Sequence, residues 1–203
     1  PVAQKFGSKD YHALRKFVAN SVWVSVVFAA VMTVVVCLFC MDILRVMKTP
    51  SDIIQEAYDY IFVIFLGIPV TYLYNLLAGI IRALGDSKTP VYFLILSSVI
   101  NIVLDIVSIG VLHMGVAGPA WATVISQGAS GLLCLFYMIK KFEILHIQKD
   151  EWAYDGSYVK TLCGMGVPMG LQYSITAIGS VLLQVAVNGL GSLAVAAITA
   201  GNK

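Results

Sequence analysis

The sequence predicts an all-α protein, a polytopic bundle of transmembrane helices with five full spans and the start of a sixth. Hydrophobic residues make up 59% of the 203 residues and charged residues only 12%, against about 25% charged residues in soluble domains. Long apolar runs recur along the chain, and Lys and Arg gather in alternate connectors. The mean hydropathy of +0.87 favours lipid as the surrounding solvent. The net charge of +2 does not indicate a nucleic-acid partner.

Each predicted span follows from length and charge, because a helix needs about 20 apolar residues to cross the hydrocarbon. Residues 17–41 and 60–81 are uncharged, residues 89–112 are apolar except for Asp105, and residues 113–139 contain no Asp, Glu, Lys or Arg. The uncharged stretch 161–202 is too long for one crossing, so the Gly-containing sequence at 188–192 predicts a break between a fifth helix and a sixth. Because the chain starts at Pro1 without an initiator Met and stops just after an apolar run, we expect a fragment.

The connectors predict the orientation of the spans. Cytoplasmic connectors are enriched in Lys and Arg. Ten such residues fall on one side of the membrane, namely Lys5, Lys9, Arg15, Lys16, Arg82, Lys88, Lys140, Lys141, Lys149 and Lys160. Only Arg45 and Lys48 fall on the other side, and Lys203 lies at the end. The bias predicts a multi-pass protein of the cell membrane with residues 1–16, 82–89 and 140–160 in the cytoplasm.

Polar residues recur at helical spacing within the predicted spans. The four stripes are Thr71, Asn75 and Gly79; Ser97, Asn101, Asp105 and Ser108; Thr123, Gln127 and Ser130; and Gln172, Thr176, Ser180, Gln184 and Asn188. Residues at these spacings share one helix face. One interpretation is helix packing, since small and polar residues line many interhelical contacts. Pro69 and Pro168 are expected to bend their helices.

Asp105 favours a functional interpretation of the stripes. A carboxylate near the centre of a span costs roughly 2.5–3.5 kcal/mol on insertion scales. Such a group pairs with a cation, is protonated or lines water, and no Lys or Arg lies at similar depth. All three states occur in ion-coupled transport. The four Cys residues, by contrast, lie in apolar stretches without a nearby His, so no metal or redox cofactor is expected.

Several motifs resemble those of MATE (multidrug and toxic compound extrusion) transporters. The sequence LAGIIRALGDSKTP at 77–90 resembles the loop between the fourth and fifth helices of that family, and AQKFGSKD at 3–10 resembles the loop after its second helix. NIVLD at 101–105 resembles the fifth helix, GVAG at 115–118 with ATVISQ at 122–127 the sixth, and GVPMG at 166–170 the seventh.

The resemblance implies part of a twelve-helix, two-lobed transporter. Residues 1–141 would form helices three to six of a partial N-terminal lobe, and residues 142–160 a cytoplasmic linker between the lobes. Residues 161–203 would form helix seven and the start of helix eight.

The resemblance also implies a cation site. The DinF-like branch of the family uses an Asp on helix one, an Asn and an Asp four residues apart on helix five, and a Thr on helix six. Asn101, Asp105 and Thr123 match the last three, and the helix-one Asp would lie outside this chain. These oxygens suit H⁺ or Na⁺, so Na⁺ at Asp105 is the one metal ion expected.

The remaining polar positions are expected at a substrate cavity, lined by Asn75, Gln127, Gln172 and Thr176. NorM-like members instead carry an acidic residue on helix seven, and none occurs at 161–202.

The expected function is cation-coupled antiport that exports organic, often cationic, drugs or metabolites from the cytoplasm, with the complete protein acting as a monomer. The alternative within a related fold is a lipid-linked oligosaccharide flippase, which would use mid-span Lys or Arg residues that are absent here. An enzyme is not expected, because His12, His113 and His146 are scattered and Asp105 is the only mid-span carboxylate. A structural scaffold would not explain Asp105 or the four stripes.

Overall fold

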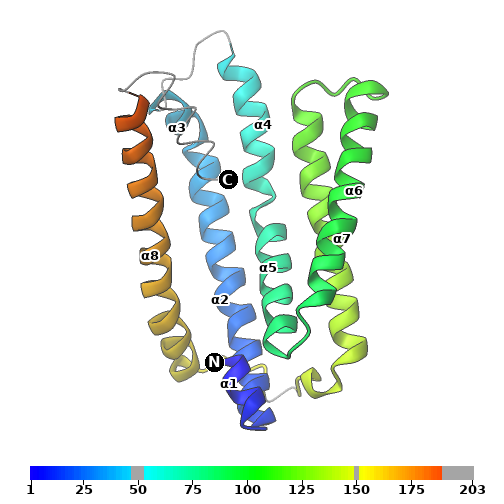
Figure 1. The fold of residues 1–203 in the computed structure, drawn as a ribbon, viewed down its shortest axis with the longest axis vertical. Helices are drawn as coiled ribbons and strands as arrows, with labels where there is room; N and C mark the ends of the chain where they lie inside the picture. The colour runs from blue at the N-terminus through cyan, green and yellow to red at the C-terminus, as the bar shows by residue number, and fades with distance from the viewer. Residues whose placement is uncertain (47–52, 149–150, 189–203) are drawn as a thin grey trace. The chain divides into compact units, whose positions relative to one another are not determined.

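The computed structural model of the chain describes residues 1–46, 53–148 and 151–188, and these residues form helices without any strand. The helices are α1 (Val2–Gly7), α2 (Tyr11–Leu38), α3 (Cys40–Val46), α4 (Ile54–Leu66), α5 (Ile68–Ala83), α6 (Lys88–Gly110), α7 (Ala117–Lys141), the 3₁₀ turn η1 (Glu143–Leu145) and α8 (Gly156–Asn188) (Figure 1). The predicted all-α class is therefore confirmed. The chain divides into two compact units, residues 1–158 and residues 159–203.

Among the described residues, α2, α6 and α7 are each long and apolar enough to cross a membrane. A fourth crossing is formed if α4 and α5 count as one span, broken and bent by 40°. The sequence predicted an uninterrupted helix at 60–81 with a bend at Pro69. The break instead falls at Gly67, because Pro69 has no N–H to donate to the carbonyl four residues earlier.

The predicted fifth span lies within α8, a helix of 33 residues that continues through Pro168. This helix is long enough for a crossing. The predicted break at 188–192 and the sixth helix lie outside the described residues, as do Lys48, Lys149, Lys203 and the side chains of Gln184 and Asn188.

Aspartate carboxylates accept hydrogen bonds from backbone N–H groups at the beginnings of α2 and α6. The Asp10 carboxylate accepts a hydrogen bond from the backbone N–H of Ala13, so α2 begins at Tyr11. Before α6, Gly85 adopts the left-handed region at φ +92° and completes a tight turn. The Asp86 carboxylate then accepts from the backbone N–H of Thr89 at 3.1 Å. Asp10 and Asp86 both precede the predicted spans 17–41 and 89–112, and α2 and α6 begin before those spans.

The core of the first unit is centred on α5 and α7. Helix α7 packs against α4, α5 and α6, and α2 packs against α5. One buried cluster joins Leu14 and Val18 of α2, Ile80 of α5, Leu84 and Leu145. This cluster brings together the beginning of α2, the end of α5 and the connector after α7, which are the three segments predicted to be cytoplasmic, at one end of the unit.

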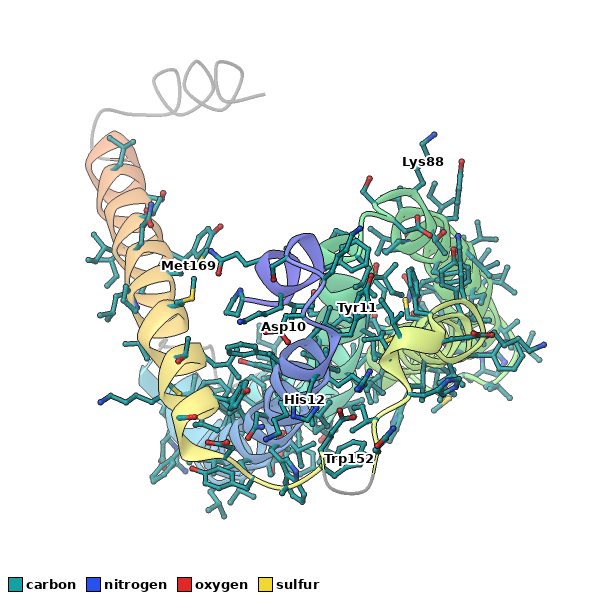
Figure 2. All side chains as sticks on the ribbon, turned by 90° about the horizontal axis from the view of Figure 1, so that it is seen from below. Asp10, Tyr11, His12, Lys88, Trp152 and Met169 are labelled. Carbon is teal, nitrogen blue, oxygen red and sulfur yellow. The ribbon has the colours of Figure 1, made fainter. Side chains whose placement is uncertain are left out.

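The connector after α7, which we call the strap (the described residues 142–148 and 151–158), is packed against the beginning of α2. The Trp23 indole N–H donates to the Trp152 carbonyl at 3.1 Å, and the Asp155 backbone N–H donates to Asn20 Oδ1 at 3.0 Å. The Tyr158 ring meets a ring of α2 edge-on. Figure 2, which views the unit from this end, shows His12 of α2 and Trp152 of the strap. The strap is therefore a folded part of the first unit.

Candidate functional site

The predicted polar stripe of α6 faces α7. Ser97 Oγ donates to the Ser126 carbonyl at 2.8 Å, and Ser130 Oγ donates to the Phe93 carbonyl at 3.0 Å. Ser97, Ser126 and Ser130 are all buried. The Ser97 and Ser130 hydroxyls join the two helices, as the packing interpretation expected for Ser residues.

Asn101 and Thr123, two of the predicted cation ligands, meet across this interface. Asn101 Nδ2 lies 3.4 Å from Thr123 Oγ1, and Thr123 donates its hydroxyl proton to the Pro119 carbonyl at 2.9 Å. With its proton engaged within α7, Thr123 Oγ1 presents only lone pairs to Asn101. The long Asn101–Thr123 contact is weak, so either group can turn to a cation at low cost.

Asp105, the third predicted ligand, lies one turn beyond Asn101 on α6. Its carboxylate Oδ1 is buried and has no hydrogen-bond partner among the described residues. The nearby Ser108 hydroxyl donates to the backbone carbonyl of Asp105 at 3.1 Å and leaves the carboxylate free of that bond. A buried acceptor without a partner costs about 1–3 kcal/mol, and more when charged. The carboxylate is therefore suited to a proton, a cation or a partner from elsewhere in the protein.

The depth of Asp105 differs from the prediction. The sequence placed it near the centre of its span, but α6 ends at Gly110, so Asp105 lies in the last third of the helix.

A small cavity of about 130 Å³ opens beside Asn101 and Thr123, between α5, α6 and α7. Its polar lining consists of Tyr74, Ser97, Ser98, Asn101, Thr123, Ser126, Gln127 and Ser130. A water molecule occupies roughly 30 Å³, so the cavity has room for a few waters or one hydrated ion. Drug-sized sites occupy about 300–1,000 Å³. The cavity thus matches a small cation and not an organic substrate.

Of the four residues expected at a substrate cavity, only Gln127 lines this one. Asn75 is exposed, and its Nδ2 donates to the Thr71 carbonyl within its own helix. Gln172 and Thr176 lie in the second unit, where the Thr176 hydroxyl donates to the Gln172 carbonyl at 2.9 Å. The described structure brings Asn101 and Thr123 together and places Gln127 in the same cavity lining.

Two polar clusters that sequence reasoning missed lie at the end of the unit that carries the strap. In the first, the buried Glu151 carboxylate accepts from Arg15 Nε at 2.6 and 2.8 Å and from the Gln148 N–H at 3.0 Å. His12 Nδ1 lies 2.9 Å from the same carboxylate. The hydrogen bond from Arg15 is the main cause that lowers the pKa of Glu151 to about 2. No sequence signal joins these residues, which lie far apart along the chain.

The second cluster surrounds Asp86. Its carboxylate accepts from the Tyr137 hydroxyl at 2.5 Å and from Thr89 Oγ1 at 2.8 Å, and Lys141 Nζ lies at 3.3 Å. The Tyr137 hydroxyl is the main cause that holds the pKa of Asp86 well below its usual range. Asp86 thereby ties the loop before α6 to the end of α7. Its place in the LAGIIRALGDSKTP motif was the available signal.

Comparison with known proteins decides the family. The MatE family model matches residues 1–107, which is more than half of the chain. The chain belongs to the MatE family. It is 33% identical to the probable multidrug resistance protein YoeA of Bacillus subtilis over 203 residues, covering 97% of this chain and 44% of YoeA. It is 38% identical over 153 residues to the probable multidrug resistance protein YpnP of the same organism, covering 73% of this chain and 33% of YpnP. The chain spans less than half the length of these MatE relatives.

Solved MATE structures have the same fold. A MATE transporter in the bent conformation matches with a TM-score of 0.90 at 24% identity, covering 98% of this chain and 45% of that one. A MOP superfamily transporter from Pyrococcus furiosus matches with a TM-score of 0.87, also at 24% identity, with the same coverage. The predicted resemblance to the MATE family is confirmed.

Proposed function

We propose that the complete protein is a cation-coupled antiporter of the DinF-like branch, which uses H⁺ or Na⁺ to export organic, often cationic, compounds across the cell membrane. The observation that carries the proposal is the buried Asp105 oxygen without a hydrogen-bond partner among the described residues, one helical turn from the Asn101–Thr123 contact. The relatives YoeA and YpnP are named as probable multidrug resistance proteins, which supports the substrate class.

The proposed mechanism begins with Asp105 facing the outside. Asp105 takes up H⁺ or Na⁺, with Asn101 and Thr123 as neutral ligands. Neutralising the carboxylate removes an attraction for a cationic substrate, which leaves the central cavity to the outside. The ion-loaded protein then opens to the cytoplasm and releases the ion. In this orientation, residues 1–16, 82–89 and 140–160 face the cytoplasm, in accord with their Lys and Arg content.

The described spans give no support to the flippase alternative. In α2 and α4–α7, Lys and Arg occur only within the first two turns or in the last turn. A pyrophosphate group at mid-depth would therefore find no cationic partner on these helices.

The test is Asp105→Asn in the complete protein reconstituted in liposomes, with a Na⁺ gradient and a pH gradient imposed separately. We expect loss of the response to the coupling gradient, because the amide takes up no proton and binds Na⁺ poorly. Asp42→Asn is the matched control, since Asp42 on α3 is exposed and pairs only loosely with Arg45 at 3.6 Å. Wild-type export by Asp105→Asn under both gradients would refute the mechanism.

A further inference from the structure

The break between α4 and α5 is built as a hinge. The two helices meet at Gly67 with a bend of 40°, and Pro69 removes the hydrogen bond that would cross the break. Fewer hydrogen bonds therefore resist a change of angle here than in an intact helix. Breaks of this kind are where membrane helices kink.

Helix α7 contacts this hinge directly. A methyl group placed on Gly67 would lie 2.5 Å from Val124 Cγ2 and 3.2 Å from the Ile64 carbonyl oxygen. Only a residue without a side chain fits against Val124 at this point. Because packed interiors transmit small displacements, a shift of Val124 must be met by a shift at Gly67.

A hydrogen bond makes a second connection one turn further along α5. Thr71 Oγ1 lies 2.7 Å from Gln127 Oε1 and 3.3 Å from the Gly67 carbonyl oxygen. The shorter distance shows that the Thr71 hydroxyl donates its stronger hydrogen bond to Gln127 Oε1. Gln127 thus holds the first turn of α5, while its side chain lines the cavity beside the candidate cation site.

Both contacts come from the turn of α7 that carries the cation ligand. Thr123 faces Asn101 of α6, Val124 adjoins it in sequence and faces Gly67, and Gln127, four residues after Thr123, completes the turn. One rigid helical turn therefore contacts the candidate site on one side and the hinge on the other.

We propose that this turn of α7 transmits the occupancy of the cation site to the α4–α5 hinge, with Val124 and Gln127 as positioning residues. The inference rests on the proposed function. A cation that draws Thr123 toward Asn101 and Asp105 moves Val124 and Gln127 with it. The angle between α4 and α5 follows, because both contacts lie within one turn of the break. A ligand shifts such an equilibrium only through its different affinity for the two arrangements, and Thr123 supplies that difference.

The test measures the hinge angle in the complete protein with its native Cys residues replaced by Ala. Spin labels are placed at Gln55 of α4, which is exposed, and at Gly79 of α5, where an added side chain meets nothing within 4 Å. Electron–electron distances are measured in liposomes during titration with Na⁺ and, separately, with acid. We expect the distance distribution to shift with the coupling ion.

Thr71→Val removes the donor to Gln127 with almost no change of shape. We expect the cation-dependent shift to fall about three- to tenfold, the range that corresponds to one neutral hydrogen bond. The cation dissociation constant from calorimetry should change less than twofold. Gln127→Leu should reduce the shift equally, and the double variant should add nothing further. An undiminished shift in Thr71→Val would overturn the role of this bond.

The steric contact between Gly67 and Val124 is tested by Gly67→Ala and by the compensating change Val124→Ala. We expect Gly67→Ala to abolish the shift, and Gly67→Ala combined with Val124→Ala to restore at least half of it, because the second change removes the opposing methyl groups. Failure of the double variant to recover the shift, while it folds and binds the cation, would overturn the proposed contact.

The outcomes separate this inference from the proposed function. If Asp105→Asn abolishes cation binding but the wild-type label distance does not respond to the cation, the hinge inference fails and the proposed function stands. If the distance responds to the cation equally in Asp105→Asn, the proposed function fails at its site.

Discussion

The stability of the packing between the strap and α2 should depend on the buried carboxylate of Glu151. The Glu151 side chain is 1% exposed. Its carboxylate accepts hydrogen bonds from Arg15 Nε at both oxygens and from the Gln148 N–H. Glu151→Gln keeps the size and one acceptor but removes the charge. A hydrogen bond to a charged group contributes about 1.5–3 kcal/mol, and the contacts from Arg15 act as one unit. We therefore expect the free energy of unfolding to fall by about 1.5–3 kcal/mol.

The assay is chemical unfolding of the purified protein in detergent, followed by tryptophan fluorescence. Lys5→Ala is the control, because the Lys5–Asp10 pair is 38% and 43% exposed, and exposed pairs contribute at most about 1 kcal/mol. Lys5 is changed in preference to Asp10, which caps α2. An equal effect of the two variants would show that burial of Glu151 does not strengthen the strap.

The pH dependence gives a second measurement of the same contact. The pKa of Glu151 falls from an ordinary value of 4.5 to about 2 on folding. A lowered carboxyl pKa stabilises the fold fully above about pH 4.5, and the contribution is lost as the pH falls toward 2. Glu151→Gln should lack this contribution between pH 4.5 and 2. A wild-type pH slope in the variant would refute the reasoning.

Two further changes test the loop before α6 and the contact between α6 and α7. Asp86→Ala removes the acceptor for the Thr89 N–H and should lower the free energy of unfolding by about 0.5–2 kcal/mol; thermal unfolding should show Asp86→Ser recovering part of this loss. Gly118→Ala would place a methyl group 2.9 Å from Ser108 Oγ and 3.0 Å from Ser108 Cβ and should cost about 1–3 kcal/mol. Gly128 lies in the same helix as Gly118, and a methyl group there would lie 3.5 Å from its nearest neighbour, Val70 Cγ1 of α5, so Gly128→Ala should be close to neutral in the same experiment.

The spans could be predicted because lipid imposes a length and an apolarity that few other segments share. The predicted spans 89–112 and 113–139 agree with α6 and α7 to within a few residues at most ends. The largest differences are at the beginnings of α2 and α4, each of which lies six residues before the predicted start. The Asp10 cap and the basic first turns extend α2 beyond the hydrocarbon, and apolarity carries no information about turns in water.

The candidate site could be predicted only in part. The spacing of Asn101 and Asp105 predicts a shared helix face, and resemblance to the family supplied Thr123 as their partner. The same spacing put Asn75 beside Thr71, yet Thr71 reaches α7 and Asn75 is exposed. A period of four residues identifies a face of a helix but not the neighbour that covers it.

For the same reason, helical spacing alone does not predict that α7 connects α6 with α5. Its polar stripe contains Thr123, which contacts α6, and Gln127, which contacts α5. Val124 is an apolar residue of the ATVISQ motif, and its contact with Gly67 depends on a break in another helix. The polar stripe of α7, which the spacing places on one face, therefore contacts two different helices, α6 and α5. Because a helix turn is rigid, ligand contact on one side of α7 and hinge contact on the other cannot vary independently, and this constraint becomes visible only when the three helices are packed.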